Sequence, residues 1–506
     1  MWQGQAGDSA GAVAALDQLL TDQLRVLGPD HPATHGTRHA LAWWRCQTGD
    51  PVGAVMAFEE LLTDRLRLLG PDHPATMGAR HSLAWCQGEA ADPAGAVTAF
   101  EQLLADQLRV LGPKHPDIPV IRGDLAWWKG QVRDPAGAVA TFERLVTERV
   151  RDLGSDHLRT LGTRNNLAWC RGKSGNPTGA ATDFEHLLAD RLRIQGPDHP
   201  QTLKTRNDLA WSRANAGDPA SAINILTPLV ADSTRILGPD HHITMIIRHN
   251  LAMCHGWAGD PARTITELEQ LLTDRRRVLG PDHPSIVVTR SDLAYSQSQV
   301  GHLTISTTCL KELLTDQLRV LGPDHPNTLV TRYYLAYTQG KAGDPSGAAI
   351  ALRQLIADAL RVLGPDHPQI LGFQHRLASC QGQSGDAAGA VTATKQVLLD
   401  RQRILAADHP QILTTRQSLA RWQGEAGDPA AAATALESLL TDSLRILGPD
   451  HPDTLGIRHS LARWREWTQG RGRANHADGV THRRPTDAEQ DPAPSRPPTR
   501  RSRSCA

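Results

Sequence analysis

The chain has 506 residues, of which 40% are hydrophobic and 4% aromatic, and its 54 Lys and Arg are balanced by 54 Asp and Glu. A formal net charge of zero offers no positive field to attract nucleic acid or an anionic membrane. Seven cysteines are too sparse for a disulfide framework, and no apolar run reaches the ~18 residues of a membrane span. Since the amino terminus also lacks a basic segment followed by an apolar one, we expect a cytoplasmic protein.

One pentapeptide, Gly-Pro-Asp-His-Pro, recurs at regular intervals along the chain. It first occurs at Gly28 and returns every 42 residues, eleven times in all with minor substitutions, the last time at Gly448. No insertion or deletion interrupts this register. Independent globular domains would not keep so constant a spacing, because the loops between them vary in length. The period therefore predicts a solenoid, in which each unit packs on its neighbours.

Predicted helices follow one another in chain order. Residues Met1 to Asp8 align with the end of a first helix, and the helix after them runs from Ser9 to Leu27. In the next unit a first helix begins at Pro32 and ends near Thr48. Asp50 then caps a second helix from Pro51 to Leu69. The repeated pattern predicts 22 helices, as ten pairs with one extra helix at each end.

The helix from Ser9 to Leu27 lacks the first helix that precedes it in a complete unit. Its apolar face nevertheless keeps the ordinary pattern, with Val13, Leu16, Leu19 and Leu20. We interpret the array as one that was cut from, or once continued into, a longer polypeptide. Its open face is expected to be frayed, or covered by a missing domain or a second copy of the chain.

The pattern stops at residue 468. Residues 469–506 contain five Pro, eight Arg and four acidic residues, with almost no large apolar side chain. Such a segment cannot bury enough surface to offset the entropy of ordering, so it is predicted to be a disordered tail. Any weak contact with nucleic acid or an acidic partner would start at this basic tail.

The repeated unit resembles the tetratricopeptide repeat. Leu41-Ala42 recurs in the first helices, as in Leu83-Ala84, and Gly49 follows the Leu by eight residues. The 42-residue period and stretches such as Thr205 to Ala210 are similar to the longer variant of kinesin light chains and of many bacterial multirepeat proteins. One position departs from the family pattern, because Arg45 stands where the family has an aromatic residue four places after the Leu.

The resemblance implies an all-α, right-handed solenoid of antiparallel helix pairs over residues 1–468, with the first helices lining an inner groove. It also implies a non-catalytic scaffold that binds a protein or peptide segment in that groove. The alternative is the sensing or regulatory arm of a bacterial signal-transduction NTPase or protein kinase. The chain carries no catalytic motif, so we expect no enzyme activity, no cofactor and no metal.

Three recurring polar positions are candidates for chemistry. Copies of the turn histidine, starting at His31, stand a whole unit apart, whereas a zinc site needs three or four ligands on one ion. A structural histidine that closes the turn is therefore predicted. Arg25 lies three residues after Asp22 and is expected to pair with it. Arg38 has no acidic partner at fixed spacing in its own unit, so it either packs on a neighbouring unit or binds a ligand anion.

Four cysteines share one position of the first helix. Other units place Trp, Ser or Thr there, and a site that tolerates such exchange is a packing site. We therefore predict buried, unreactive thiols at Cys86, Cys170, Cys254 and Cys380.

One face of the first helix remains after its two packing stripes are assigned. The residue after His39 varies there as a polar side chain, for example Ser82, Asp124 and Asp208, which predicts an open face. A large aromatic recurs on this face in most units, and Arg replaces it in the last two. Such a strip usually signals binding, although each aromatic could instead pack on the next unit. The predicted partner-binding groove consists of Trp43, Trp85, Trp127, Trp169, Trp211, Tyr295, Tyr337, Arg421 and Arg463, with the two arginines meeting an acidic part of the partner.

Overall fold

A computed structural model describes residues 9–90, 92–132, 134–279, 283–363, 368–405, 409–446, 448–449 and 452–468. Within these ranges the chain forms 22 α-helices and no strand, which confirms the predicted all-α solenoid. The segment Met1 to Asp8 and the predicted disordered tail, residues 469–506, lie outside the described residues.

The first helix of each unit begins next to the turn histidine and is 15 to 17 residues long. The first helices are α3 (Pro32–Thr48), α5 (Pro74–Glu89), α7 (Ile118–Val132), α9 (Leu158–Lys173), α11 (Pro200–Asn215), α13 (His242–Trp257), α15 (Pro284–Gln299), α17 (Pro326–Lys341), α19 (Pro368–Gln383), α21 (Pro410–Glu425) and α23 (Pro452–Thr468). The bounds predicted for the helix from Pro32 to Thr48 are confirmed.

The second helices are 18 or 19 residues long. They are α2 (Ser9–Val26), α4 (Pro51–Leu69), α6 (Pro93–Leu111), α8 (Pro135–Leu153), α10 (Pro177–Gln195), α12 (Pro219–Leu237), α14 (Pro261–Leu279), α16 (Leu303–Val320), α18 (Pro345–Leu363), α20 (Ala387–Ile404) and α22 (Pro429–Ile446).

Local capping explains where the helices begin and end. The main-chain NH of Ala33 donates to His31 Nδ1 at 3.2 Å, and that of Gly53 donates to Asp50 Oδ1 at 2.8 Å. Gly70 ends α4 with φ of 81°, in the left-handed region that glycine adopts without strain. The predicted structural role of the turn histidine is confirmed, since the same cap recurs at His73, His115, His157, His199, His241, His283, His325 and His409. The copies His367 and His451 lie outside the described residues.

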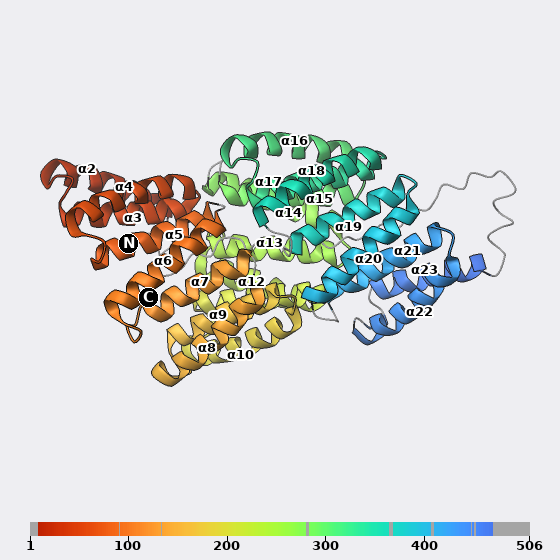
Figure 1. Ribbon diagram of the computed structural model, residues 1–506, viewed down its shortest axis with the longest axis horizontal. Helices are drawn as coiled ribbons and strands as arrows, with labels where there is room; N and C mark the ends of the chain where they lie inside the picture. The colour runs from red at the N-terminus through yellow and green to blue at the C-terminus, as the bar shows by residue number, and fades with distance from the viewer. Residues whose placement is uncertain are drawn as a thin grey trace.

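The helices form two layers. Consecutive helices pack against each other along the whole array, with α2 at one end and α23 at the other (Figure 1). First helices also contact the next first helix, as α3 contacts α5 and α15 contacts α17. Second helices make no comparable contacts with each other in the described part of the chain. The first helices therefore form the inner layer of the solenoid, and the second helices form the outer one.

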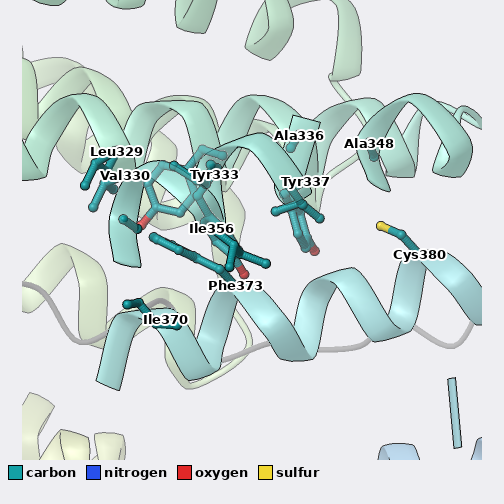
Figure 2. Packing of buried hydrophobic residues seen from close by; sticks show 14 of the residues in the cluster. Leu329, Val330, Tyr333, Ala336, Tyr337, Ala348, Ile356, Ile370, Phe373 and Cys380 are labelled. Atoms are coloured by element: carbon teal, nitrogen blue, oxygen red, sulfur yellow. The ribbon is translucent and has the colours of Figure 1, made fainter. Parts of the chain in front are cut away.

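The hydrophobic core lies between the layers and crosses from unit to unit. Phe58 and Leu61 of α4 are fully buried, in one cluster with Ala42 of the same unit and Leu83 of the next. Farther along, Tyr333 of α17 packs among residues of α18 and α19 in a cluster that joins three units (Figure 2). Full burial of one such side chain contributes about 1.5–3 kcal/mol. Each unit thus completes the core of its neighbour, which is why the array is stable only as a stack.

Candidate functional site

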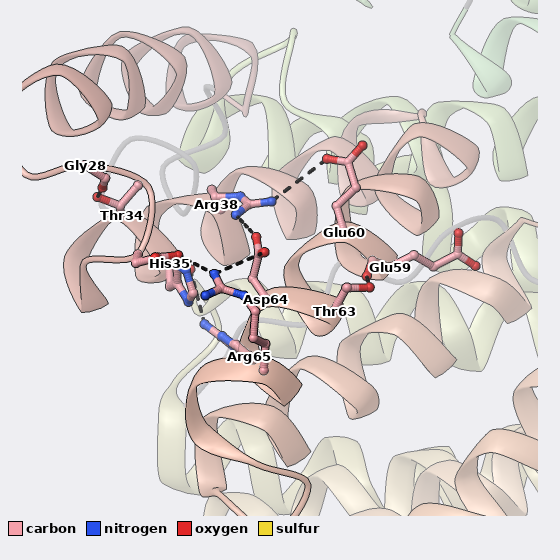
Figure 3. A network of polar contacts seen from close by, with 11 residues as sticks. Gly28, Thr34, His35, Arg38, Glu59, Glu60, Thr63, Asp64 and Arg65 are labelled. Carbon is pink, nitrogen blue, oxygen red and sulfur yellow. Dashed lines mark hydrogen bonds and ion pairs between the residues drawn. The ribbon is translucent and has the colours of Figure 1, made fainter.

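Most arginines of the Arg38 series pair with a carboxylate on the second helix of their own unit, contrary to the sequence prediction. Arg38 Nη1 of α3 lies 2.6 Å from Asp64 Oδ2 of α4, with Glu60 3.9 Å away on the same helix (Figure 3). The prediction was wrong because the acidic partner stands 26 residues away, on the second helix rather than on the same one. The same ion pair recurs at Arg80–Asp106, Arg164–Asp190, Arg206–Asp232, Arg248–Asp274, Arg290–Asp316, Arg332–Asp358 and Arg416–Asp442.

In six units an arginine of the Arg25 series joins the second helix to the turn before its unit. Arg67 lies 3.9 Å from Asp64, as the predicted i,i+3 pairing requires, but only 2.7 Å from Asp30 of the turn. The equivalent hydrogen bonds from Arg193 lower the pKa of Asp156 to about 2. These pairs are half exposed, so each adds little stability, and their carboxylates are already occupied.

Buried arginines form a further series that the sequence analysis missed. Arg65 of α4 is 6% exposed and donates to the main-chain oxygens of Ala75 at 2.6 Å and His35 at 3.2 Å, on the first helices of two units (Figure 3). Arg275 does the same with Ser285 and Met245, and burial lowers its pKa to about 10. The signal in the sequence is the recurrence of Arg two residues before the Arg67 position. These buried arginines connect the first helices of adjacent units.

Much of the predicted aromatic strip is buried. Trp85 is 4% exposed, Trp127 7%, Tyr295 9% and Tyr337 0%. The prediction of an exposed strip is wrong at these positions because each side chain points between neighbouring first helices. The ring of Trp85, for example, meets that of Trp128 of the next unit edge to face, with centroids 5.3 Å apart. Packing on the next unit, the alternative interpretation, holds here.

Three of the predicted tryptophans keep part of their surface open. Trp43, Trp169 and Trp211 are half-buried on the inner helices α3, α9 and α11. Trp169 Nε1 donates to Asp208 Oδ2 of the next unit at 2.9 Å, which fixes the plane of its ring. Trp211 packs on Trp257, with centroids 5.0 Å apart. These contacts hold the rings of Trp169 and Trp211, and each of the three indoles keeps part of its surface accessible.

The two arginines at the far end of the series are half-buried. The Arg421 guanidinium lies 4.7 Å from the ring centroid of Trp422, and that of Arg463 lies 5.0 Å from that of Trp464. Arg463 also pairs with Glu425 at 3.3 Å. The ring contacts therefore hold both guanidinium groups in place on the inner helices α21 and α23.

The varying polar position on the first helix was predicted to lie on an open face. In the structure it is buried between first helices. Asp124 is 0% and Asp208 2% exposed. Asp124 Oδ2 lies 2.8 Å from His81 Nε2 of the preceding unit, which meets the hydrogen-bonding need of the buried carboxylate. Asn250 donates to Asn207 at 2.9 Å in the same way. Polar pairs 43 residues apart thus join adjacent first helices.

The predicted packing position of the cysteines is buried in the described residues. The thiols of Cys86, Cys170, Cys254 and Cys380 are buried, as predicted, and form no disulfide within the described residues; burial raises the pKa of Cys254 to about 12. Across the described ranges no group of three or more His, Cys, Asp or Glu could hold a metal ion. The helices in these ranges include none that is both long and apolar enough to cross a membrane.

A family model confirms the resemblance. The tetratricopeptide repeat model matches residues 36–75, 160–201, 244–285 and 412–453, so the chain contains tetratricopeptide repeats. These segments fall in phase with the 42-residue period and indicate no catalytic family. A search of curated proteins gave no match.

Solved structures with similar architecture share little sequence. A kinesin light chain of Podosopora anserina with nearly identical TPR-like repeats is 24% identical, over 40% of this chain and 97% of that chain, with a TM-score of 0.35. A human IFIT1 dimer with m7Gppp-AAAA is 14% identical, over 89% and 94%, with a TM-score of 0.44. BtubC from P. vanneervenii is 13% identical, over 47% and 92%, with a TM-score of 0.34. We draw no functional conclusion from similarity at this level.

Proposed function

We propose that this protein is a non-catalytic scaffold that binds a protein segment along the inner surface of its solenoid. The observation that carries the proposal is the set of half-buried indoles on the inner layer, Trp43, Trp169 and Trp211. An indole held in one orientation offers a large apolar contact at little entropic cost, as at other protein interfaces. Tetratricopeptide scaffolds in general bind protein partners, which agrees with this assignment.

The groove predicted from the sequence divides into contacting and supporting residues. Trp43, Trp169 and Trp211 contact the partner through their open edges. The buried Trp85, Trp127, Tyr295 and Tyr337 support the wall behind them. Arg421 and Arg463, held by their ring contacts, meet an acidic part of the partner. The change from aromatic to basic along the array sets the direction in which an extended segment lies.

Binding is tested with a displayed library of random peptides, selected on the immobilised full chain. Peptides that contain apolar residues followed by acidic ones should be enriched. Affinity for a synthetic copy should fall about tenfold in Trp211→Ala, because truncation of an anchoring indole costs at least 1.4 kcal/mol. Met56→Ala is the control, since Met56 is 60% exposed on the outer helix α4.

Folding is checked by circular dichroism of each variant. Trp127 is unsuitable for this test because its side chain is only 7% exposed and its removal would leave a cavity. If no peptide is enriched, or if Trp211→Ala and Met56→Ala bind the selected peptide equally well, the inner surface is not the binding site.

A further inference from the structure

The two ends of the array expose residues that belong to the core elsewhere. Leu455 of α23 is 49% exposed, whereas Leu413, at the same position of α21, is 4% exposed. Leu19 of α2 is 45% exposed, whereas Leu439, at the same position of α22, is 0% exposed. Each end of the described array therefore presents an apolar side chain that is buried at the same position of an inner unit.

The two open faces are the two halves of one repeated interface. Within the complete pair α21·α22, Leu413 of the first helix and Leu439 of the second belong to the same buried cluster. The face of α23 carries Leu455 in the place of Leu413, and that of α2 carries Leu19 in the place of Leu439. A first helix with an open face thus stands at one end, and a second helix with the matching open face stands at the other.

The charged residues of the two ends are also complementary, in the same register as the leucines. Arg416 of α21 pairs with Asp442 of α22 at 2.6 Å. Arg458 takes the place of Arg416 in α23, where it is exposed and makes no ion pair within the described ranges. Asp22 takes the place of Asp442 in α2, where its ion pair in the described part of the chain is a long contact to Arg25 at 3.7 Å. Each end therefore carries one half of the ion pair that Arg416 and Asp442 form between α21 and α22.

We propose that α23 of one copy docks on α2 of a second copy, as α21 docks on α22, so that chains associate head to tail. Leu455 buries against Leu19 of the second copy, and Arg458 pairs with its Asp22. Such an interface leaves a free face at each end, so association continues into a filament or closes into a ring.

A second copy suits this surface better than the chain's own tail does. Residues 469–506 contain no Leu, Ile, Met, Phe, Trp or Tyr, so they offer no apolar face to cover Leu455. The face of α2, by contrast, supplies both the leucines and the carboxylate in the required register.

The first experiment measures mass against concentration by sedimentation velocity on the full 506-residue chain. The proposal expects species larger than a monomer that grow from low to high micromolar concentration. Leu455→Glu and Leu19→Glu should each weaken association about tenfold or more, because a carboxylate would be buried opposite leucine. Both residues are exposed, so folding should be unaffected. Met56→Glu, on an exposed outer position of an inner unit, should associate like the wild type.

A charge exchange tests the register. Arg458→Glu alone places like charges opposite each other between copies, as does Asp22→Arg alone, and each should weaken association about tenfold. An equal mixture of the two variants should recover it, since every contact between unlike copies pairs opposite charges. Loss of folding cannot produce recovery on mixing.

Three results would each overturn the proposal. The first is a wild-type chain that stays monomeric at all these concentrations. The second is association that persists in Leu455→Glu and Leu19→Glu, or a mixture of the charge variants that stays as weak as its components. The third is association that appears only after residues 469–506 are removed, which would show that the tail itself covers α23.

Discussion

The indole of Trp128 lies directly over Gly88 of the preceding first helix. A Cβ on Gly88 would stand 2.5 Å from Cη2 and Cζ2 of that ring, closer than side chains tolerate. Gly382 and Gly424 meet Trp422 and Trp464 in the same way, at 2.4 Å. Large and small residues therefore face each other at this position of adjacent first helices, where each of these three tryptophans lies against a glycine.

Gly88→Ala should destabilise the contact between α5 and α7 by about 1–3 kcal/mol, because the added methyl group forces the buried indole out of place. Chemical unfolding followed by tryptophan fluorescence measures the change. Gly78→Ala is the matched control in the same helix, since a Cβ there meets no atom within 4 Å. The control should be neutral or stabilising by up to about 1 kcal/mol, because alanine favours helix over glycine. Equal losses in both variants would contradict the packing argument.

Removing a turn histidine should weaken its helix start. His73 Nδ1 accepts from the main-chain NH of Ala75 at 3.1 Å, and His73→Ala leaves that NH without its cap. We expect a loss of about 0.5–2 kcal/mol in thermal or chemical unfolding, and His73→Asn should recover most of it because asparagine is a good cap. An asparagine variant as unstable as the alanine variant would mean that the imidazole acts through packing instead.

Mild acid should destabilise the fold through buried histidines. Burial is the main cause that lowers the pKa of His39 and His409 to about 4 and that of His242 to about 3, from an ordinary 6.5. As the pH falls below 6.5, these histidines bind protons in the unfolded chain but stay neutral in the folded chain. The stability that these groups contribute is complete above pH 6.5 and is lost as the pH falls toward about 4.

Thermal unfolding by circular dichroism across this pH range should show a midpoint that drops by several degrees. His242→Gln should show a smaller drop, since it removes one of the three groups. The paired carboxylates respond at lower pH, as the Asp156 pKa of about 2 indicates. A midpoint that stays constant between pH 6.5 and pH 4 would contradict the assignment of these histidines as buried and neutral.

In dilute monomer, α2 should be the least protected helix of the array. Its Leu19 is 45% exposed, whereas the equivalent Leu229 of α12 is fully buried. Hydrogen exchange measured along the chain should therefore be at least about tenfold faster in Ser9–Val26 than in Pro219–Leu237. Equal protection of the two helices in a verified monomer would show that the face of α2 is covered.

The sequence by itself determined the local structure of this protein. Pro32 and Pro51 at helix starts, the His31 and Asp50 caps and the glycine stops act through neighbours in the chain, so the helix bounds and the period could be predicted. Tertiary structure alone decided what each face contacts. Asp64 meets Arg38, and Trp85 meets the next unit, only because the helices that carry them stack side by side. A helical pattern specifies that a face exists, whereas the neighbour that covers it is set by the curvature of the stack and the sizes of the facing side chains.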